Sequence, residues 1–391
     1  MSEIAARPVG GKIVTPFFLV LFALWVLGTI AGIQRWAGGL GAATAMNDGY
    51  PWGIWIALDV VVGTALASGG YAVALLVYIF NRGKYHPLVR PALLTAALGY
   101  STAAVAIAFD VGRYWGLWKI PLFVWSWNLR SALLEVALCV MAYIVVLWIE
   151  VSPAFLDSWK EGKNEGLRRF AAAVSPKLQA ALPFVIAFGL LLPTMHQSSL
   201  GSIFLLAASK LHKLWLTPWL PFFFLVSAIA MGYAAVVVEN TFTSRAYRLK
   251  PETELLGMLG LVAGGIVVVY LAVRWIDVLA RGQAAAIFGA GRFSFLFLAE
   301  TALWLAAAVL LLRKRTRTSP ALQLQAAFLL IGAGVLYRFN TYLFAFQPGY
   351  GWTYFPSVQE ILITFGLIAT ETMAYLVVIK KFPVLGGAAA R

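Results

Sequence analysis

The feature that most limits the fold is the repeated occurrence of apolar runs long enough to cross a lipid bilayer. A helix needs about 20 apolar residues to cross the hydrocarbon core, and about ten such runs follow one another along the chain. The segments between them are short, with no long linker or low-complexity tract. The predicted spans are Thr15–Gln34, Trp52–Phe80, Pro91–Val111, Leu129–Ile149, Leu178–Leu200, Trp219–Glu239, Leu255–Leu279, Phe293–Leu312, Leu322–Phe346 and Ser357–Ile379.

The composition supports an all-α polytopic membrane protein. Of the 391 residues, 61% are hydrophobic and 12% are charged, and the mean hydropathy is +0.83. A water-soluble domain of this size cannot bury so much apolar surface. The net charge of +14 is spread over the loops between spans, which indicates membrane topology rather than nucleic-acid binding. We expect one integral membrane domain, residues 1–391, with no removable signal peptide, because the N-terminal segment lacks a small-residue cleavage site.

Basic residues predict the orientation in the membrane. Most of the 30 lysines and arginines fall on the side that holds both termini, with a dense group in RKRTR at 313–317. Because positively charged loops stay in the cytoplasm, both termini are predicted to be cytoplasmic. A short interfacial helix is expected on that side within segment 150–170. The loops on the other side are rich in Trp, Tyr, Pro and Gly, and either anchor the protein at the interface or form a docking surface for a partner.

A weak internal repeat has two explanations. LLEVAL at 133–138 and LAETAL at 298–303 share a pattern, and DVGR at 110–113 and DVLAR at 277–281 follow the third and seventh spans. A parallel repeat of residues 52–200 and 219–346 would give two four-helix bundles, spans two to five and six to nine, with two flanking helices. Chance similarity between apolar segments explains the same matches.

Polar residues inside the spans mark the candidate site, because ionisable groups are costly in lipid and usually face a partner or an internal cavity. Tyr100 lies near the middle of its span, and Glu239 and Glu371 lie toward the cytoplasmic side. The others fall in the outer half of the membrane: Asp59, Asp110, Arg113, Arg130, Glu135, His196, Glu300, Arg338, Asn340 and Glu360.

Each of these groups has a structural interpretation beside a functional one. Asp110 and Arg113 fit an ion pair that closes a helix end, and Arg338 fits the neutralisation of a buried carboxylate. Glu135 and His196 instead suggest a proton relay, because a carboxyl in an apolar helix tends to be protonated and histidine titrates near neutral pH. Pro193 is expected to break the helix that carries His196, so that backbone groups face a cavity.

The scarcity of ligating residues argues against bound metals and haem. A b-type haem in a helical bundle usually has two axial ligands on facing helices, and only His196 of the three histidines lies within a span. We therefore expect no haem and no metal site. The single cysteine, Cys139, cannot hold an iron–sulfur cluster, which usually takes about four cysteines.

Several stretches resemble the NrfD/polysulfide-reductase membrane-subunit family, and within it the ten-span HybB-type subunits of nickel–iron hydrogenase 2. The resemblance extends over nearly the whole chain. The stretches are GYPWGIWIALDVVVGTALASGGYA (49–72), VYIFNRGKYHPLVRPALLTAALGYS (77–101), DVGRYW (110–115), LLPTMHQSSLGS (191–202) and AFQPGYGWTYFPSVQEILI (345–363).

The resemblance implies a membrane subunit that reacts with quinone, either menaquinone or ubiquinone, in the inner membrane of a bacterium. Its partners would be an extrinsic iron–sulfur electron-transfer subunit and the small and large subunits of a hydrogenase, with no catalysis by this chain alone. Tyr100, Glu135, His196 and Glu239 match positions that the family associates with quinone chemistry or proton conduction. The quinone pocket candidates are His196, Gln197, Ser198, Asp110 and Arg113.

Other functions stay open at this point. The partner is alternatively another NrfD-type oxidoreductase that acts on polysulfide or sulfur compounds. The internal repeat and the intramembrane carboxyls also occur in secondary transporters. A pure membrane anchor without a quinone role is the third alternative.

Overall fold

A computed structural model describes residues 7–385 of the chain. These residues contain ten helices that are long and apolar enough to cross a membrane. The predicted all-α polytopic fold with ten spans is confirmed. The spans are α1 (Pro16–Gly38), a composite second span (Trp55–Ile79), a third span (Gly83–Asp110) whose main part is α5 (Val89–Asp110), α7 (Ala132–Lys160), α8 (Glu165–Leu206), α9 (Leu220–Ala246), α10 (Thr253–Ala280), α12 (Arg292–Leu312), a ninth span (Pro320–Phe344) that begins with α13 (Pro320–Phe339), and α14 (Val358–Lys381).

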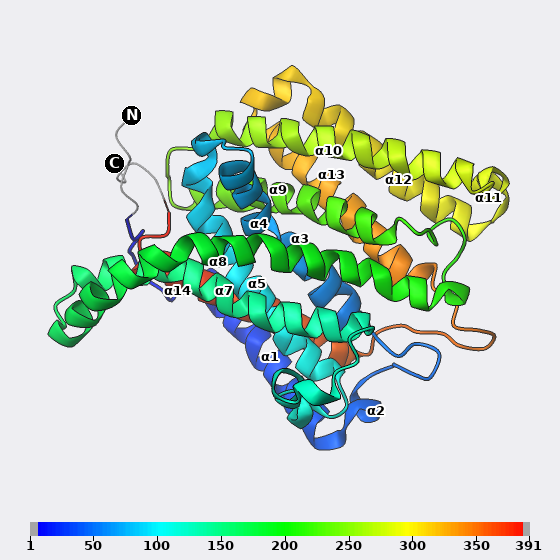
Figure 1. The fold of residues 1–391 in the computed structure, drawn as a ribbon, viewed down its shortest axis with the longest axis horizontal. Helices are drawn as coiled ribbons and strands as arrows, with labels where there is room; N and C mark the ends of the chain where they lie inside the picture. The colour runs from blue at the N-terminus through cyan, green and yellow to red at the C-terminus, as the bar shows by residue number, and fades with distance from the viewer. Residues whose placement is uncertain (1–6, 386–391) are drawn as a thin grey trace.

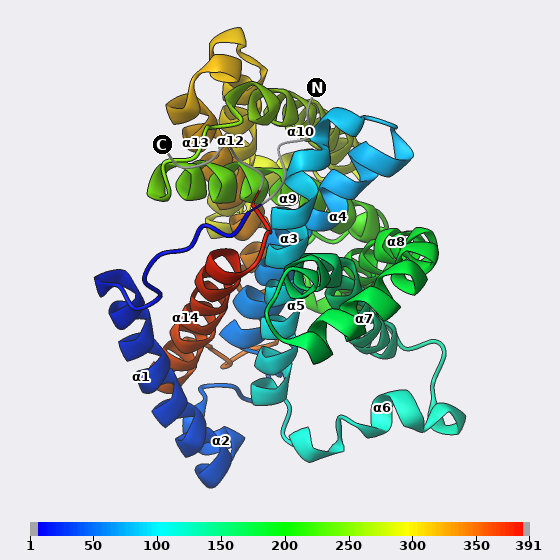
Figure 2. The ribbon, with the colours of Figure 1, turned by 90° about the vertical axis from the view of Figure 1, so that its left-hand side faces the viewer.

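Two groups of four helices pack side by side. The second span, α5, α7 and α8 contact one another in sequence, and α9, α10, α12 and α13 form the second group. Helix α9 joins the groups by packing against α8 and against α3 (Gly63–Ala67) and α4 (Gly69–Ala74) of the second span. Helices α1 and α14 pair with each other, and α14 packs against α5 (Figures 1 and 2). Whether the two groups descend from a repeat of 52–200 and 219–346 stays a prediction.

Glycines set the closest helix contacts. A Cβ atom on Gly28 of α1 would lie 2.6 Å from the Cα of Gly366 on α14, and one on Gly232 of α9 would lie 2.8 Å from the carbonyl carbon of Ser68. Small residues let membrane helices approach closely and gain van der Waals contact. The pairing of α1 with α14, and of α9 with the second span, therefore depends on the absence of a side chain at these positions.

Both described ends of the chain lie on one side of the bundle. The Arg7 amide donates to the Leu385 carbonyl at 3.4 Å, and the Val9 amide donates to Ile379 at 3.0 Å. We call this the terminal side, and the other the opposite side. Three short helices cross the opposite side: α2 (Leu40–Ala43), α6 (Lys119–Leu122) and α11 (Ala284–Gly289). Helix α6 sits in a loop that extends away from the bundle (Figure 2).

The helices α7 and α8 are longer than predicted. Both continue past the apolar part of their spans and form a hairpin that projects on the terminal side (Figure 1). Asn164 begins α8 by accepting hydrogen bonds from the amides of Gly166 and Leu167 at 3.0 and 3.1 Å. The expectation of a separate interfacial helix within 150–170 is therefore wrong, because only residues 161–164 interrupt the hairpin.

Helix α8 also runs straight through the stretch that was expected to break it. Pro193 is an interior residue of the helix, which ends only at Leu206. The nearby hydroxyls bond to carbonyls of their own helix, Thr194 to Leu190 at 2.8 Å and Ser198 to Thr194 at 2.9 Å. Such side-chain bonds help membrane helices tolerate proline.

The second span is irregular instead. It contains two π-helical segments, Trp55–Val62 and Leu75–Ile79, and a third such segment, Asn340–Phe344, ends the ninth span. Single π-turns are frequent at functional sites, because the wider turn moves side chains out of the regular register. Asp59 lies in the first of these segments and Asn340 begins the last.

Candidate functional site

Four buried polar side chains from three helices meet around the hydroxyl of Thr64, and we call them the Thr64 cluster: Thr64, Tyr100, His196 and Gln197. The Nε2 atom of His196 lies 3.2 Å from Thr64 Oγ1. Gln197 Nε2 donates to the same oxygen at 3.0 Å and to the Tyr100 hydroxyl at 3.5 Å. His196, Gln197, Thr64 and Tyr100 are all fully buried. The cluster thus joins α8, α5 and the second span.

The hydrogen bonds identify the tautomer of His196. Thr64 Oγ1 donates its only proton to the Val60 carbonyl at 2.6 Å, so its remaining capacity is as an acceptor. His196 Nε2 must then carry the proton and donate, which leaves Nδ1 unprotonated in the neutral ring. Among the residues that the structure describes, His196 Nδ1 and Gln197 Oε1 have no hydrogen-bond partner. The cluster therefore presents two free acceptor atoms inside the protein.

Aromatic rings enclose the histidine on the α5 and α7 side. The Tyr100 ring meets the His196 ring edge to face at 5.5 Å, and the Tyr143 ring meets Tyr100 at 4.6 Å. Edge-to-face packing of this kind holds rings in a defined orientation. Tyr143 and Thr64 were not predicted as site residues, and no local motif marks either of them.

Glu135 lies apart from the cluster. It sits half-buried in the first turn of α7, where Ser131 caps the helix by accepting from the Leu134 amide at 3.2 Å. Tyr143 is the α7 residue that reaches Tyr100, and it follows Glu135 by eight positions, or about 12 Å along the helix. No hydrogen bond in residues 7–385 joins Glu135 to His196, so the predicted relay between them has no direct contact.

The predicted pairing of Asp110 with Arg113 is wrong. Arg113 is exposed and is absent from the ion pairs of the described chain, while Asp110 ends α5 with its Oδ1 atom buried and unpartnered there. Arg35 of α1 reaches this helix end instead and donates to the carbonyls of Phe109 and Val111, both at 2.9 Å. A cation at a helix C-terminus satisfies carbonyls that the helix leaves free. The tertiary approach of α1 decides which arginine is the partner.

Ser198 also faces away from the cluster. It is half-buried, and its hydroxyl donates only to carbonyls of its own helix, those of Thr194 and Met195, both at 2.9 Å. The residues that contact Thr64 are its neighbours His196 and Gln197. Of the predicted quinone pocket candidates, only His196 and Gln197 are thus brought together.

Glu239 lies near the terminal side, where its Oε1 atom accepts a 2.7 Å hydrogen bond from the hydroxyl of Tyr375 on α14. Both residues line a cavity of about 20 Å³, together with Asn240, Ser244 and Lys250. That volume accommodates one or two water molecules.

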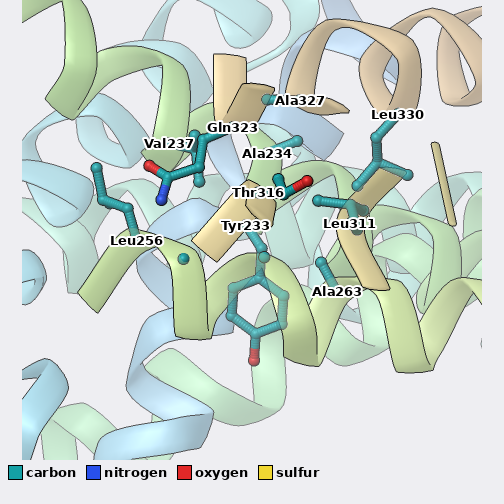
Figure 3. Close-up of a pocket in the computed structure, with 12 residues that line it drawn as sticks. Tyr233, Ala234, Val237, Leu256, Ala263, Leu311, Thr316, Gln323, Ala327 and Leu330 are labelled. Carbon is teal, nitrogen blue, oxygen red and sulfur yellow. The ribbon is translucent and has the colours of Figure 1, made fainter. Parts of the chain in front are cut away.

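A second cavity, of about 10 Å³, lies inside the second helix group and is lined by Leu256, Thr316 and Gln323 among others (Figure 3). The hydroxyl of Tyr233 points away from it, and donates instead to the Ala72 carbonyl at 2.8 Å. Neither cavity has room for a quinone ring.

A second group of buried charges occupies the core of the second helix group. The Glu300 carboxylate accepts from Trp215 Nε1 and Asn340 Nδ2, both at 2.8 Å, and lies 3.9 Å from Arg274 Nη2. Arg274 was missed in the sequence, although its stretch VRWID places an arginine deep in an apolar span. The ring faces of Phe223, Phe297 and Tyr337 surround its guanidinium at 5.3 to 5.6 Å.

Arg338 does not neutralise a carboxylate, contrary to prediction. It is fully buried, and it donates to the carbonyls of Val61 and Phe224 at 3.0 and 3.3 Å and to the Ser227 hydroxyl at 3.2 Å. These partners belong to the second span and to α9. Arg338 therefore connects the two helix groups through neutral acceptors.

No group of three or more His, Cys, Asp and Glu side chains in residues 7–385 is arranged to hold a metal ion. Cys139 is buried and free.

Comparison with known proteins identifies relatives along the whole chain. A protein of Escherichia coli described as "Probable Ni/Fe-hydrogenase 2 b-type cytochrome subunit" is 37% identical over 97% of this chain and 95% of its own length. The "Menaquinone reductase, integral membrane subunit" of Nitratidesulfovibrio vulgaris is 29% identical over 66% of this chain and 61% of its own length. The "Hdr-like menaquinol oxidoreductase integral membrane subunit" of Archaeoglobus fulgidus is 23% identical over 94% of this chain and 92% of its own length.

The first of these relatives corrects the prediction that no haem is involved, because a b-type cytochrome subunit is by name a haem protein. The prediction considered ligands from this chain alone, where only His196 lies within a span and a histidine–methionine site would need a methionine at the same depth. The histidines themselves do not form a pair. His86 is exposed in the 3₁₀ helix Gly83–Leu88 at the terminal-side end of the third span. His212 stacks on Phe293 at 4.1 Å in a loop on the opposite side, and His196 faces Thr64. The geometry of this chain thus does not identify axial ligands.

The family comparison agrees with the resemblance found in the sequence. The family described as "Polysulphide reductase, NrfD" matches residues 42–344, a range that includes the whole Thr64 cluster, Glu135 and Glu239. This match covers far more than half of the chain, and the E. coli relative extends the similarity to nearly all of it. The chain belongs to the NrfD family of integral membrane proteins.

Proposed function

We propose that this chain is the quinone-reactive membrane subunit of a respiratory oxidoreductase complex of the nickel–iron hydrogenase type. An extrinsic iron–sulfur subunit exchanges electrons with the quinone pool at this chain, and the hydrogenase small and large subunits complete the complex. The chain is not catalytic alone. It lies in the inner membrane of a bacterium with the terminal side facing the cytoplasm, in agreement with the distribution of its lysines and arginines.

The relatives support this proposal. The one that aligns over 97% of the chain is named as a subunit of a hydrogenase. Two others, from a bacterium and an archaeon, are named for menaquinone or menaquinol. Menaquinone chemistry is thus named in two relatives whose descriptions otherwise differ.

The observation that carries the proposal is the free Nδ1 atom of His196 in the Thr64 cluster. Reduction of a quinone takes two electrons and two protons, and a membrane-embedded site must supply those protons away from bulk water. Neutral His196 accepts a proton at Nδ1, while Thr64 fixes the ring through Nε2. Once protonated, Nδ1 is a donor that transfers the proton to a quinone oxygen. In the reverse direction, the same atom takes a proton from a quinol hydroxyl.

The other members of the cluster position this histidine. Gln197 binds Thr64 and Tyr100 at the same time, so it fixes the acceptor that orients His196. Glu135 remains a candidate for the reprotonation of His196, and Tyr100 and Glu239 for the proton route toward the cytoplasm. Asp110 and Arg113 remain candidates for the quinone pocket near the opposite side.

The test compares His196→Ala with Ser198→Ala in the assembled complex in membranes. Ser198 is the matched control, because its hydroxyl bonds only to its own helix. We expect His196→Ala to lower hydrogen-dependent quinone reduction by roughly 10²-fold, the scale of a lost acid–base group. Reduction of an artificial soluble acceptor by the extrinsic subunits should persist in both variants. Wild-type quinone reduction in His196→Ala would instead favour the alternative of a membrane anchor.

A second candidate is a complex that acts on polysulfide or another sulfur compound, and the description of the family favours it. The proteins that co-purify with the chain distinguish the two, since a hydrogenase brings nickel–iron subunits. A secondary transporter, the remaining alternative, would purify without cluster-bearing partners.

A further inference from the structure

Helix α14 carries a polar stripe that the Thr64 cluster does not use. Glu360, Thr364, Glu371 and Tyr375 fall within about 60° of one another at about 100° per residue, so they share one face of the helix. Three of them contact other spans. Thr364 donates a hydrogen bond to Asp59 of the second span, Tyr375 donates one to Glu239 of α9, and the Glu371 carboxyl lies beside Gly99 of α5. The stripe therefore faces protein, along most of the membrane thickness.

Glu360, at the opposite side, is a structural cap and ends the stripe. Its Oε2 atom accepts from the amides of Ala45 and Ser357 at 2.9 and 2.8 Å, and its Oε1 atom accepts from the Tyr354 hydroxyl at 2.7 Å. Burial raises the pKa of Tyr354, so that hydroxyl keeps its proton and stays a donor. A carboxylate with these three donors is held in place by hydrogen bonds.

The next carboxyl along the stripe is much less constrained. Asp59 is buried in the π-helical part of the second span, and its Oδ2 atom accepts a 2.7 Å bond from Thr364 Oγ1. Asp59 lies five positions before Thr64 on the same span, or within about 8 Å along the axis. This end of the stripe therefore lies close to the proposed site of quinone chemistry.

Glu371 occupies the middle of the stripe. No hydrogen bond to its carboxyl occurs in the described part of the chain, and its Oε1 atom lies 3.4 Å from where a Cβ atom on Gly99 would stand. Gly99 and Tyr100 are consecutive in α5, so the Glu371 face and the Thr64 cluster lie on different sides of this helix. An ionisable group without a partner inside a membrane is costly, and such groups usually serve a function.

The stripe ends at the terminal-side cavity. Tyr375 follows Glu371 by one helical turn and donates to Glu239 at 2.7 Å. Both line the 20 Å³ cavity, whose other lining residues include Lys250 and Glu252 from the loop between α9 and α10. The levels of Asp59, Glu371 and Glu239 are about 6 to 11 Å apart along α14, a spacing that takes about one to three bridging water molecules at about 2.8 Å per hydrogen bond.

We propose that Asp59, Thr364, Glu371, Tyr375 and Glu239 form a proton-transfer column between the terminal-side cavity and the Thr64 cluster. Each carboxylate takes a proton from the neighbour nearer the cavity and releases one toward Asp59, so the column itself consumes none. Two passages supply the two protons of one quinone reduction. This inference rests on the proposed function, since it requires a reaction at the Thr64 cluster that takes up protons.

The test measures protons taken up from the terminal side per quinone reduced. The whole complex is studied in sealed membrane vesicles, with hydrogen as donor, a short-chain menaquinone analogue as acceptor and a pH-sensitive dye on the terminal side. Glu371→Gln keeps the shape of the side chain and removes its proton, and we expect the ratio to fall about 10-fold or more. Thr370→Val is the matched control, because Thr370 is exposed and bonds only to its own helix. Its ratio should equal that of the wild type.

An unchanged ratio in Glu371→Gln overturns the column, whatever happens to the rate. Should that variant fail to assemble, Tyr375→Phe decides in the same way, because it removes only the hydroxyl that bonds Glu239. Glu371→Asp keeps a titratable group and should keep most of the ratio. A wild-type complex that reduces no quinone contradicts the proposed function instead, and this result precedes any variant.

Discussion

The hydroxyl of Thr64 lies 3.2 Å from Nε2 of His196, and 132 residues separate the two in the sequence. Because Thr64 gives its own proton to the Val60 carbonyl, its oxygen accepts from the histidine and from Gln197. One hydroxyl thus fixes both the orientation and the tautomer of the ring. The free Nδ1 atom, on which the proposed proton transfer depends, is a consequence of this arrangement.

Removal of that hydroxyl should therefore impair the reaction without removing the histidine. We expect Thr64→Val, which keeps the branched shape, to lower quinone reduction by about 10-fold or more, because the ring loses its fixed tautomer. The measurement is the rate of quinone reduction by membranes that contain equal amounts of assembled complex. Thr29→Val is the control, since Thr29 is exposed and bonds only to Trp25 of its own helix. Equal rates in the two variants would show that Thr64 does not position His196.

The hydrogen bonds of Arg338 are expected to stabilise the contact between the two helix groups. It is a buried cation whose bonds to Val61, Phe224 and Ser227 join the second span to α9. Hydrogen bonds to charged groups contribute about 1.5–3 kcal/mol each, so Arg338→Met should destabilise the protein by several kcal/mol. Thermal unfolding of the purified chain in detergent measures this loss. The exposed Arg315, changed to methionine, should leave the unfolding temperature within a degree or two.

The glycine contact between α1 and α14 is a test of how the flanking pair is held. A Cβ atom on Gly28 would lie 2.6 Å from the Gly366 Cα and 2.8 Å from the Leu362 carbonyl oxygen. Since both are backbone atoms, Gly28→Val should push α1 away and lower stability by about 1–3 kcal/mol. Gly265→Val is the matched control on α10, because nothing lies within 4 Å of its Cβ position. Similar stabilities for the two variants would contradict close packing of α1 on α14.

The spans could be predicted from the sequence because the bilayer requires an apolar segment of fixed length, and hydropathy detects such segments directly. The hydropathy signal ends where polar residues begin. It therefore did not reveal that α7 continues to Lys160, or that α8 already begins at Glu165. His196 stood out as a polar group in an apolar run. Its partner Thr64 did not, because the rotation of one helix against another depends on packing along their entire length.

The arginines show the same limit. Sequence spacing favoured Arg113 as the partner of Asp110, yet Arg35 from another helix reaches that end of α5. Arg338 was expected beside a carboxylate, and neutral carbonyls satisfy it instead. Sequence indicates that a buried charge needs partners, but the fold decides which atoms supply them.

The orientation in the membrane can be tested independently of the chemistry. Reporters fused at the C-terminus and within RKRTR, residues 313–317, should report the cytoplasm, and one within QPGYGW, residues 347–352, should report the outside. Cysteine-accessibility labelling at the same places provides the measurement in intact cells. A reversed pattern would place the Glu239 cavity on the outer side, and the proton column would then draw from the wrong compartment.

The remaining prediction concerns Glu135, which family resemblance connects with His196 although the structure keeps them apart. Glu135 lies about 12 Å along α7 from the residue that contacts Tyr100, so any transfer between them needs water. If both residues serve one proton route, the rate losses from Glu135→Gln and His196→Ala should not combine, because either change alone already stops transfer along that route. The double variant should then reduce quinone about as slowly as the slower single variant. The rates of the four proteins form a double-mutant cycle that measures this directly. Losses that multiply would place Glu135 on a separate route, and leave the α14 column as the supply of protons to His196.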